Sequence, residues 1–190
     1  MSLFVQDRII LDLCGGTGAW SRPYAEAGYD VRLITLPDQD VRLFKIPDER
    51  VWGILAAPPC DDFTLACTRY WKDKDADGRT QNSLSIVDAC IRIVYACNPL
   101  MFWALENPAG RLFSWLGPYQ HSFNPCDYGD PWTKRTMLWG RFFKPKPNPV
   151  EPVPSKDSWI NKLGGHSEKT KTLRAITPPG FARAFFEANQ

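Results

Sequence analysis

Short apolar runs alternate with polar or glycine-rich segments along this chain. Three of the runs lie within Arg8–Trp20, Val51–Thr64 and Met101–Leu105, and each has the length of a buried strand in a parallel sheet. Apolar residues recur at helical spacing over Ser83–Cys97, which predicts an amphipathic helix. The same patterns predict further elements: helices at Trp20–Ala27 and Thr177–Asn189, and strands at Asp30–Leu36 and within Tyr128–Arg141.

A glycine-rich turn follows the first of these strands. Gly15, Gly16 and Gly18 let the backbone bend tightly and approach a ligand, and a helix and a second strand come next. This order predicts a right-handed βαβ unit. It therefore predicts an α/β, Rossmann-like fold whose mostly parallel sheet carries helices on both faces. Tight turns also use glycine where no ligand binds, so the turn alone does not establish a cofactor site.

Two missing features narrow the class of cofactor. Nucleotide-binding Rossmann sites usually carry an acid at the end of the second strand, whereas Ile34-Thr35-Leu36-Pro37 stands there and the nearest acids are Asp38 and Asp40. No lysine followed by serine or threonine stands after the glycines in phosphate-loop spacing, which disfavours an NTPase. A cofactor without a pyrophosphate is therefore expected.

The run that begins at Val51 ends abruptly at Pro58-Pro59-Cys60. Two prolines fix the backbone and prevent a helix, so the thiol of Cys60 is expected on a rigid turn, where it is a candidate nucleophile. The next strand ends in Glu106-Asn107-Pro108, and parallel strands end at one edge, so Glu106 and Cys60 are expected to face one pocket. The alternative for Cys60 is a small buried hydrophobic residue, the commoner role of a cysteine in this position.

Two polar segments are predicted to lack packed structure. Asp61–Asn82 is expected to be a long loop, and its cations and aromatics suit phosphates and an unstacked base, which makes it a candidate lid. An ordinary surface loop is the alternative. Lys144–Pro154 carries five prolines and is expected to be an extended linker.

Composition indicates one folded domain over residues 1–190, with 44% hydrophobic and 23% charged residues. No apolar run could cross a bilayer and no signal peptide is evident, so a cytoplasmic location without a membrane partner is expected. Six cysteines without a Cys-x-x-Cys pair indicate free thiols and no metal site. Thr133–Arg174 holds ten lysines and arginines against three acids, which is either a phosphate-binding face or a solvated surface.

Taken in order, the motifs of the chain resemble those of DNA (cytosine-5) methyltransferases, in particular the short phage-type members. The resemblance covers most of the chain and is carried by Asp12-Leu-Cys-Gly-Gly-Thr-Gly-Ala-Trp20, Pro58-Pro59-Cys60 with Phe63-Thr64, Asp77-Gly78-Arg79, Glu106-Asn107-Pro108 and Thr177-Pro178-Pro179. It implies a class I S-adenosylmethionine-dependent methyltransferase fold. It also implies methylation of carbon 5 of cytosine in DNA, with the target base flipped out of the duplex.

The resemblance implies a role for each matching residue. Cys60 matches the thiolate that adds to carbon 6 of the base, and Glu106 matches the acid at ring nitrogen 3. Asn107 would position the loop, and Lys134 would contact the flipped nucleotide. The implied residues of the S-adenosylmethionine site are Asp12, Cys14, Gly15, Gly16, Gly18, Trp20, Asp40 and Pro58, and Arg174 is a further candidate that the family pattern does not supply. The implied substrate-binding residues are Pro59, Phe63, Thr64, Arg79 and Arg135.

The chain departs from the family pattern in several places. Cys14 stands where the family usually has phenylalanine, and only Lys134 aligns cleanly with the family's Gln-x-Arg-x-Arg motif. Residues 142–171 form a proline-rich, basic segment in place of a full target-recognition domain. Base-edge readout needs a folded surface in a groove, so this reduction predicts short or relaxed sequence specificity.

Arg174 stands where the family usually has a neutral donor pocket. It would pair with the carboxylate of carboxy-S-adenosylmethionine if the reaction were carboxymethylation, and a surface arginine or a phosphate contact is the alternative. Two other readings remain open, namely an enzyme acting on free cytosine nucleotide and a non-catalytic DNA-binding homologue. A monomer is the expected state.

Overall fold

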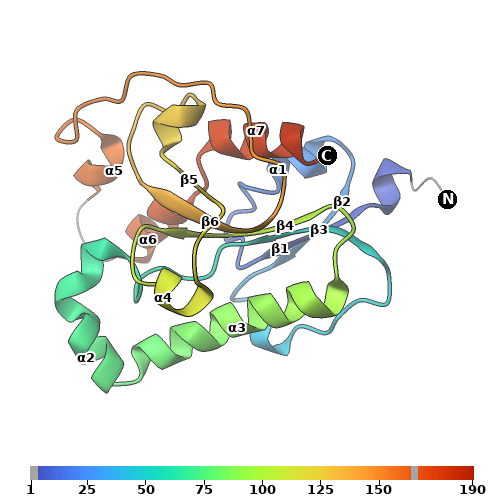
Figure 1. The fold of residues 1–190 in the computed structure, drawn as a ribbon, viewed down its shortest axis with the longest axis horizontal. Coiled ribbons are helices and arrows are strands. Elements are labelled where there is room, and N and C mark those ends of the chain that lie inside the picture. Colours follow the sequence, from blue (N-terminus) through green and yellow to red (C-terminus); the bar gives the residue numbers. More distant parts are fainter. Residues whose placement is uncertain (1–3, 164–166) are drawn as a thin grey trace.

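The computed structural model describes residues 4–163 and 167–190, and six strands within them form one mixed sheet (Figure 1). Its order is β2-β1-β3-β4-β6-β5. Strands β2, β1, β3 and β4 are parallel, and β6 runs antiparallel to both of its neighbours. The strands are β1 (Ile9–Leu13), β2 (Asp30–Ile34), β3 (Val51–Ala56), β4 (Phe102–Pro108), β5 (His121–Phe123) and β6 (Thr136–Arg141). The protein is thus an α/β protein with a Rossmann-like arrangement of a mostly parallel sheet.

Helices lie on both faces of the sheet, with α3 and α4 on one face and α1 and α7 on the other (Figure 1). The α-helices are α1 (Arg22–Glu26), α2 (Trp71–Ala76), α3 (Arg79–Cys97), α4 (Phe113–Leu116), α5 (Trp159–Lys162), α6 (Glu168–Ala175) and α7 (Pro179–Ala188). Short 3-10 helices complete the elements: η1 (Val5–Asp7), η2 (Val41–Leu43), η3 (Leu65–Tyr70) and η4 (Pro125–Tyr128).

Alternation along the strands divides the core into two apolar layers. Successive strand residues point to opposite faces, so Leu11 joins the layer under α3 while Ile10 joins the layer under α7. The α3 layer is aliphatic, whereas the α7 layer is rich in aromatic rings. The aromatic layer contains the buried residues Trp20, Tyr24, Phe102, Phe181 and Phe185.

The strand register brings three strand ends to one edge of the sheet. Leu13 of β1 lies opposite Ala56 of β3, and Ala56 lies opposite Leu105 of β4. The chain leaves β1 and β3 after these positions, whereas β4 continues through Glu106 to Pro108 beside β6 at the same carboxyl edge. The register confirms that the ends of these strands share one edge, and a pocket faced by both Cys60 and Glu106 stays a prediction.

The predicted loop over Asp61–Asn82 was wrong in most of its length. η3 and α2 occupy its middle, and α3 begins at Arg79 rather than at Ser83. Gly78, with a φ of 83°, turns the chain between α2 and α3, and the Asp77 carboxylate accepts from the Arg79 backbone N–H at 3.1 Å. Only a few side chains of this segment are buried, so its sequence shows no apolar periodicity from which the helices could have been predicted.

The prediction of an unpacked linker over Lys144–Pro154 was also wrong, although the segment is extended. Its backbone N–H groups donate along η4 and the chain that follows it. Asn148 bonds the carbonyl of Asp127 at 2.9 Å, and Val150 bonds that of Cys126 at 2.8 Å. These backbone hydrogen bonds therefore attach the segment to the rest of the protein.

Among the described residues, no helix is both long and apolar enough to pass through a bilayer.

Gly53 provides a test of the packing between β3 and β4. A Cβ atom at this position would lie 2.3 Å from the ring of Phe102, which is fully buried. We expect Gly53→Ala to lower the free energy of unfolding by about 1–3 kcal/mol, because the ring has no space into which it can move. Urea denaturation measures this loss. In a Phe102→Leu background the same substitution should cost less, and an equal cost in both backgrounds would show that the ring contact is not the cause.

Candidate active site

A hydrogen bond inside the protein joins the ends of β3 and β4. Asn107 is fully buried, and its side-chain N–H donates to the carbonyl of Pro58 at 3.1 Å. Pro58 is buried while Pro59 is exposed, so the chain emerges from the sheet between them and carries Cys60 toward the surface. The hydrogen bond fixes the distance between the turn that carries Cys60 and the strand that carries Glu106.

The turn after Cys60 pairs with the segment that follows β4. The carbonyl of Cys60 accepts from the backbone N–H groups of Phe63 and Thr64, each at 2.9 Å. Thr64 pairs with Gly110 in an isolated antiparallel bridge. A Cβ atom at Gly110 would lie 2.0 Å from the carbonyl oxygen of Phe63, so only glycine allows this close approach.

Cys60, Glu106 and Lys134 form a cluster of coupled charges at the carboxyl edge of the sheet. Burial raises the pKa of the Cys60 thiol to about 12, the positive charge of Lys134 opposes that shift, and the acids Asp61 and Glu106 add to it. Burial also raises the pKa of the Glu106 carboxyl, and Lys134 again opposes the shift. Near neutral pH the thiol is therefore protonated, and the carboxyl holds its proton to a higher pH than an exposed glutamate does.

A small cavity of about 10 Å³ lies beside Glu106 and Lys134. Thr136 of β6 and Thr177, before α7, are among the residues that line it. This volume is roughly that of one water molecule. The Lys134 ammonium beside this cavity donates to the carbonyl of Arg174 at 2.8 Å.

The glycine turn contains three residues with left-handed backbone. The φ angles are 57° at Cys14, 55° at Gly16 and 68° at Gly18. Glycine adopts this conformation without cost, whereas Cys14 adopts it with strain. Strained residues of this kind cluster where a backbone must approach a ligand, which is what the sequence predicts for this turn.

Asp12 supports the glycine turn from inside the protein. It is fully buried, and one carboxylate oxygen accepts from the hydroxyl of Ser21 at 2.5 Å. The other oxygen, Oδ1, has no hydrogen-bond partner among the described residues. A Cβ atom at Gly15 would lie 2.3 Å from this carboxyl group, so the turn packs directly onto it. Burial raises the pKa of Asp12 to about 6, and the Ser21 hydrogen bonds limit the shift.

An open pocket of about 440 Å³ lies between the glycine turn and the start of α7. Thr17 and Ala19 of the turn form one wall, and Ile176 and Thr177 form another. Arg22 adds a positive charge at the rim. Because Thr177 also lines the small cavity beside Glu106, the open pocket and the charge cluster lie on either side of one loop. The volume suits a ligand of cofactor size.

Several residues predicted to contact ligands have other partners in the structure. Trp20 and Phe63 are buried core residues: Trp20 packs edge-on to Phe185 at 5.4 Å, and Phe63 packs on Trp115 at 5.8 Å. Neither presents a free face to a ligand. The remaining charged residues of this set form local contacts: Asp40 with Arg42 at 2.6 Å, Arg79 with Asp77 at 2.5 Å, Arg135 with the Tyr119 hydroxyl at 3.0 Å, and Arg174 with the Leu163 carbonyl.

Sequence reasoning missed the ion pair that holds the Cys60 turn. Lys74 on α2 is 7% exposed, its ammonium lies 2.9 Å from the Asp62 carboxylate, and it donates to the carbonyl of Asp61 at 2.6 Å. The other Asp62 oxygen accepts from the hydroxyl of Ser83 at 2.5 Å. Lys74 stands in a run of alternating lysines and aspartates, and nothing in that run distinguishes the one lysine that is buried.

Neither models of known protein families nor curated proteins match the sequence of this chain. Within residues 4–163 and 167–190, no group of three or more histidine, cysteine, aspartate or glutamate side chains is arranged to hold a metal ion.

The raised pKa of Asp12 predicts a pH-dependent contribution to stability. The folded protein holds this proton up to about pH 6, whereas an unfolded aspartate releases it near 3.8. The contribution is therefore complete below pH 3.8 and is lost as the pH rises through 6. Relative to Asp12→Asn, the wild type should lose about 3 kcal/mol of unfolding free energy across this window. Urea titrations of both proteins measure the difference, and a constant difference would contradict the assignment.

The high pKa of the Cys60 thiol predicts slow alkylation. Because the thiolate is the reactive form, the rate at Cys60 should rise about tenfold per pH unit between pH 8 and 10, without a plateau. Lys134→Met should slow the reaction at every pH, because Lys134 stabilises the thiolate. Arg135→Met, an exposed neighbouring cation, is the control and should leave the rate unchanged. Peptide mass spectrometry follows the reaction, and a plateau below pH 9 would refute the assignment.

Proposed function

We propose that this protein transfers a methyl group from S-adenosylmethionine to carbon 5 of cytosine in DNA, with Cys60 as the nucleophile. One observation carries the proposal: a thiol and a carboxyl, both partly buried, and a lysine interact electrostatically at the carboxyl edge of parallel strands. Their frame is fixed by the hydrogen bond between Asn107 and Pro58. An acid with a raised pKa suits protonation of a ring, and a thiol beside a lysine suits addition of sulfur to that ring once the thiol has lost its proton.

The fold and the open pocket support the same reaction. A mostly parallel sheet with helices on both faces agrees with the class I methyltransferase fold that the sequence motifs imply. The pocket of about 440 Å³ beside the strained glycine turn is large enough for the donor. Asp12 and the strained residues of the turn do not line this pocket, and the unpartnered Oδ1 of Asp12 lies beneath the turn. The fit to S-adenosylmethionine rests on the size of the pocket and on the turn residues Thr17 and Ala19 in its wall.

Each residue of the charge cluster has a defined task in this reaction. Cys60, as thiolate, forms a bond to carbon 6 of the ring, while Glu106 donates a proton or hydrogen bond to ring nitrogen 3 and so removes the developing negative charge. Carbon 5 would then take up the methyl group, whose bond to the donor sulfur breaks and leaves a neutral thioether. The thiol proton of Cys60 is released to solvent before the attack, and the proton at nitrogen 3 returns to Glu106 when the thiolate departs. Loss of the carbon 5 proton to solvent and departure of the Cys60 thiolate complete the exchange. Lys134 favours the thiolate form of Cys60 throughout.

S-adenosylmethionine, when bound, supplies an electrophilic methyl group on a positively charged sulfur. A second cation close to Cys60 would lower the pKa of its thiol further. The nucleophile would thus be activated only when the site is loaded. In the unloaded protein the thiol stays protonated near neutral pH, and that form resists alkylation and oxidation.

A carboxylated donor receives less support. The guanidinium of Arg174 donates to the carbonyl of Leu163, and the carbonyl of Arg174 accepts from Lys134. Both contacts give Arg174 a role in closing the chain around the small cavity beside Glu106. Arg174 is not among the residues that line the open pocket. The donor proposed here is therefore the unmodified one.

Nucleoside mass spectrometry tests the proposal directly. DNA from cells that express the wild type should contain 5-methylcytosine, and DNA from cells that express Cys60→Ala should contain none. Glu106→Gln keeps the shape of the side chain but cannot donate a carboxylic proton, so we expect turnover to fall by about a hundredfold or more. Circular dichroism on the purified variants controls for folding. Unmodified cytosine in the presence of folded wild-type protein would overturn the proposal.

A further inference from the structure

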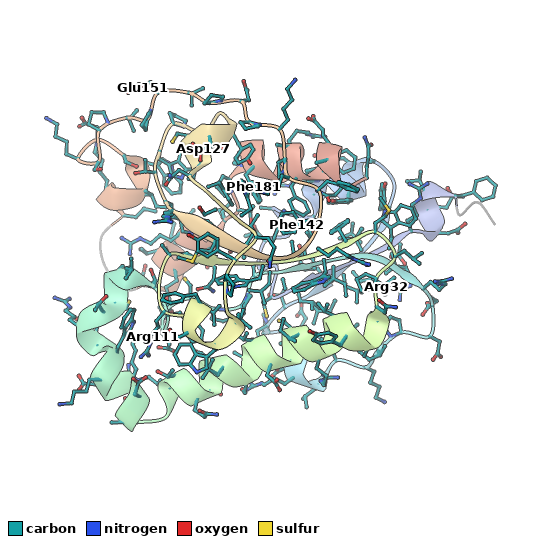
Figure 2. The ribbon with its side chains drawn as sticks, in the orientation of Figure 1. Arg32, Arg111, Asp127, Phe142, Glu151 and Phe181 are labelled. Carbon is teal, nitrogen blue, oxygen red and sulfur yellow. The ribbon has the colours of Figure 1, made fainter. Side chains whose placement is uncertain are left out.

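Arg111 anchors the segment after Cys60 to the strands. Its guanidinium Nε donates to the carbonyl of Asp62 at 3.0 Å, Nη1 donates to the Asp75 carboxylate at 2.8 Å, and Nη2 donates to the Thr80 hydroxyl at 2.7 Å. Figure 2 shows Arg111 between α2 and α4. One side chain from the end of β4 therefore holds the Cys60 turn, α2 and the start of α3 at the same time.

Within the segment, the buried pair of Lys74 and Asp62 ties the Cys60 turn to α2, and the bonds from Arg111 hold both to the chain that follows β4. Removing one partner of a buried ion pair costs roughly 3–5 kcal/mol, so the segment does not swing away cheaply. Extrusion of a base from a duplex itself costs a few kcal/mol, which a protein must supply by pushing part of itself into the stack. A base that is already unstacked avoids this cost.

The surface beside the Cys60 turn carries exposed aromatic rings. Trp115 on α4 is 46% exposed, packs against Phe63 at 5.8 Å and lies 5.6 Å from the Arg111 guanidinium. The Arg69 guanidinium lies 4.6 Å above the ring of Tyr70, which is also exposed. Two further exposed apolar side chains come from the same segments, Leu65 and Phe113. Half-exposed rings backed by arginine are the surface on which unstacked bases pack in single-strand-binding proteins.

The basic segment supplies charge without a groove-reading element. Between β6 and α7, the described residues form two helices only, α5 and α6, neither longer than eight residues. The cations on this segment are exposed, among them Lys144, Lys146, Lys156, Lys162 and Lys169. Exposed cations bind phosphates regardless of sequence, whereas a major groove is read by a long helix or a strand pair inserted into it.

From these observations we infer that the substrate is single-stranded DNA rather than a duplex. The target cytosine reaches Cys60 from an unpaired strand, a neighbouring base stacks on Trp115, and the exposed lysines hold the phosphates. This inference rests on the proposed function for its chemistry. Its two structural grounds, the anchored segment and the aromatic surface, are independent of which group is transferred.

Binding tests the inference without depending on turnover. Fluorescence anisotropy with one cytosine-rich DNA sequence, single-stranded or annealed to its complement, should show at least tenfold tighter binding of the single strand. Trp115→Ala should weaken single-strand binding about tenfold and leave duplex binding unchanged, and Trp115→Phe should restore most of it. Tyr95→Ala is the matched control, because Tyr95 is 79% exposed on α3, near the opposite edge of the sheet. Thermal melting confirms that each variant is folded.

A covalent trap separates failure of this inference from failure of the proposed chemistry. Oligonucleotides with 5-fluorocytosine should form a stable Cys60 adduct with S-adenosylmethionine present, because fluorine cannot leave carbon 5 as a proton does. We expect the adduct on the single strand at least ten times faster than on the duplex. An adduct formed equally fast on the duplex overturns the inference and leaves the proposed function standing. Single-strand preference in binding with no adduct overturns the chemistry, and tighter binding of the RNA counterpart overturns the choice of DNA.

Discussion

The hydrogen bond from Asn107 to the carbonyl of Pro58 is the contact on which the arrangement of the site depends. It is made inside the protein at 3.1 Å, where water cannot replace it, and it links the ends of two adjacent parallel strands. A carbonyl next to a proline has few other donors, since proline itself has no N–H. The alignment of β3 with β4 brings Cys60 and Glu106 to one edge, and this bond fixes the separation of the two segments that carry them.

Burial then sets the protonation state of Cys60 and Glu106, which this hydrogen bond helps to position. Cys60 and Glu106 both have raised pKa values because their charged forms lose solvation, and Lys134 opposes both shifts. Two acidic groups that favour the neutral form can lie close together without mutual repulsion. The same arrangement makes the site responsive to an added positive charge, since a cation near the thiol stabilises its ionised form. The electrostatic control of the Cys60 thiol thus follows from the fold rather than from any one residue.

Much of this arrangement could be predicted from the sequence, because its causes are local. Apolar runs that end in glycine or proline define β1, β3 and β4, and parallel strands end at one edge, so Cys60 and Glu106 were expected together. The strand predicted within Tyr128–Arg141 is present as β6. The predicted helix at Thr177–Asn189 is present as α7, two residues later at its start.

The rest could not be predicted because it depends on contacts between distant segments. Lys74 and Asp62 are ordinary surface residues by composition, and only their pairing allows their burial. Trp20 stands beside the glycine turn in sequence, yet α7 supplies the rings that enclose it. Arg111 is separated from its partner Asp75 by 36 positions. Local pattern detects which residues are apolar, but it does not show which polar side chains find partners inside.

Two features of this chain disfavour the opening of a duplex: the segment after Cys60 is anchored, and the basic segment over residues 142–171 is reduced. A protein that opens a duplex needs a mobile part to enter the stack and a folded surface to read the groove. In this chain the segment after Cys60 is held by the bonds from Arg111 and is stiffened from within by the pair of Lys74 and Asp62. Between β6 and α7 the described residues form only short helices. The exposed rings on η3 and α4 instead offer flat apolar area next to the Cys60 turn. A rigid Cys60 turn with an aromatic surface beside it can accept a base that arrives unstacked. The same rigid turn could not enter a duplex to extract a stacked base.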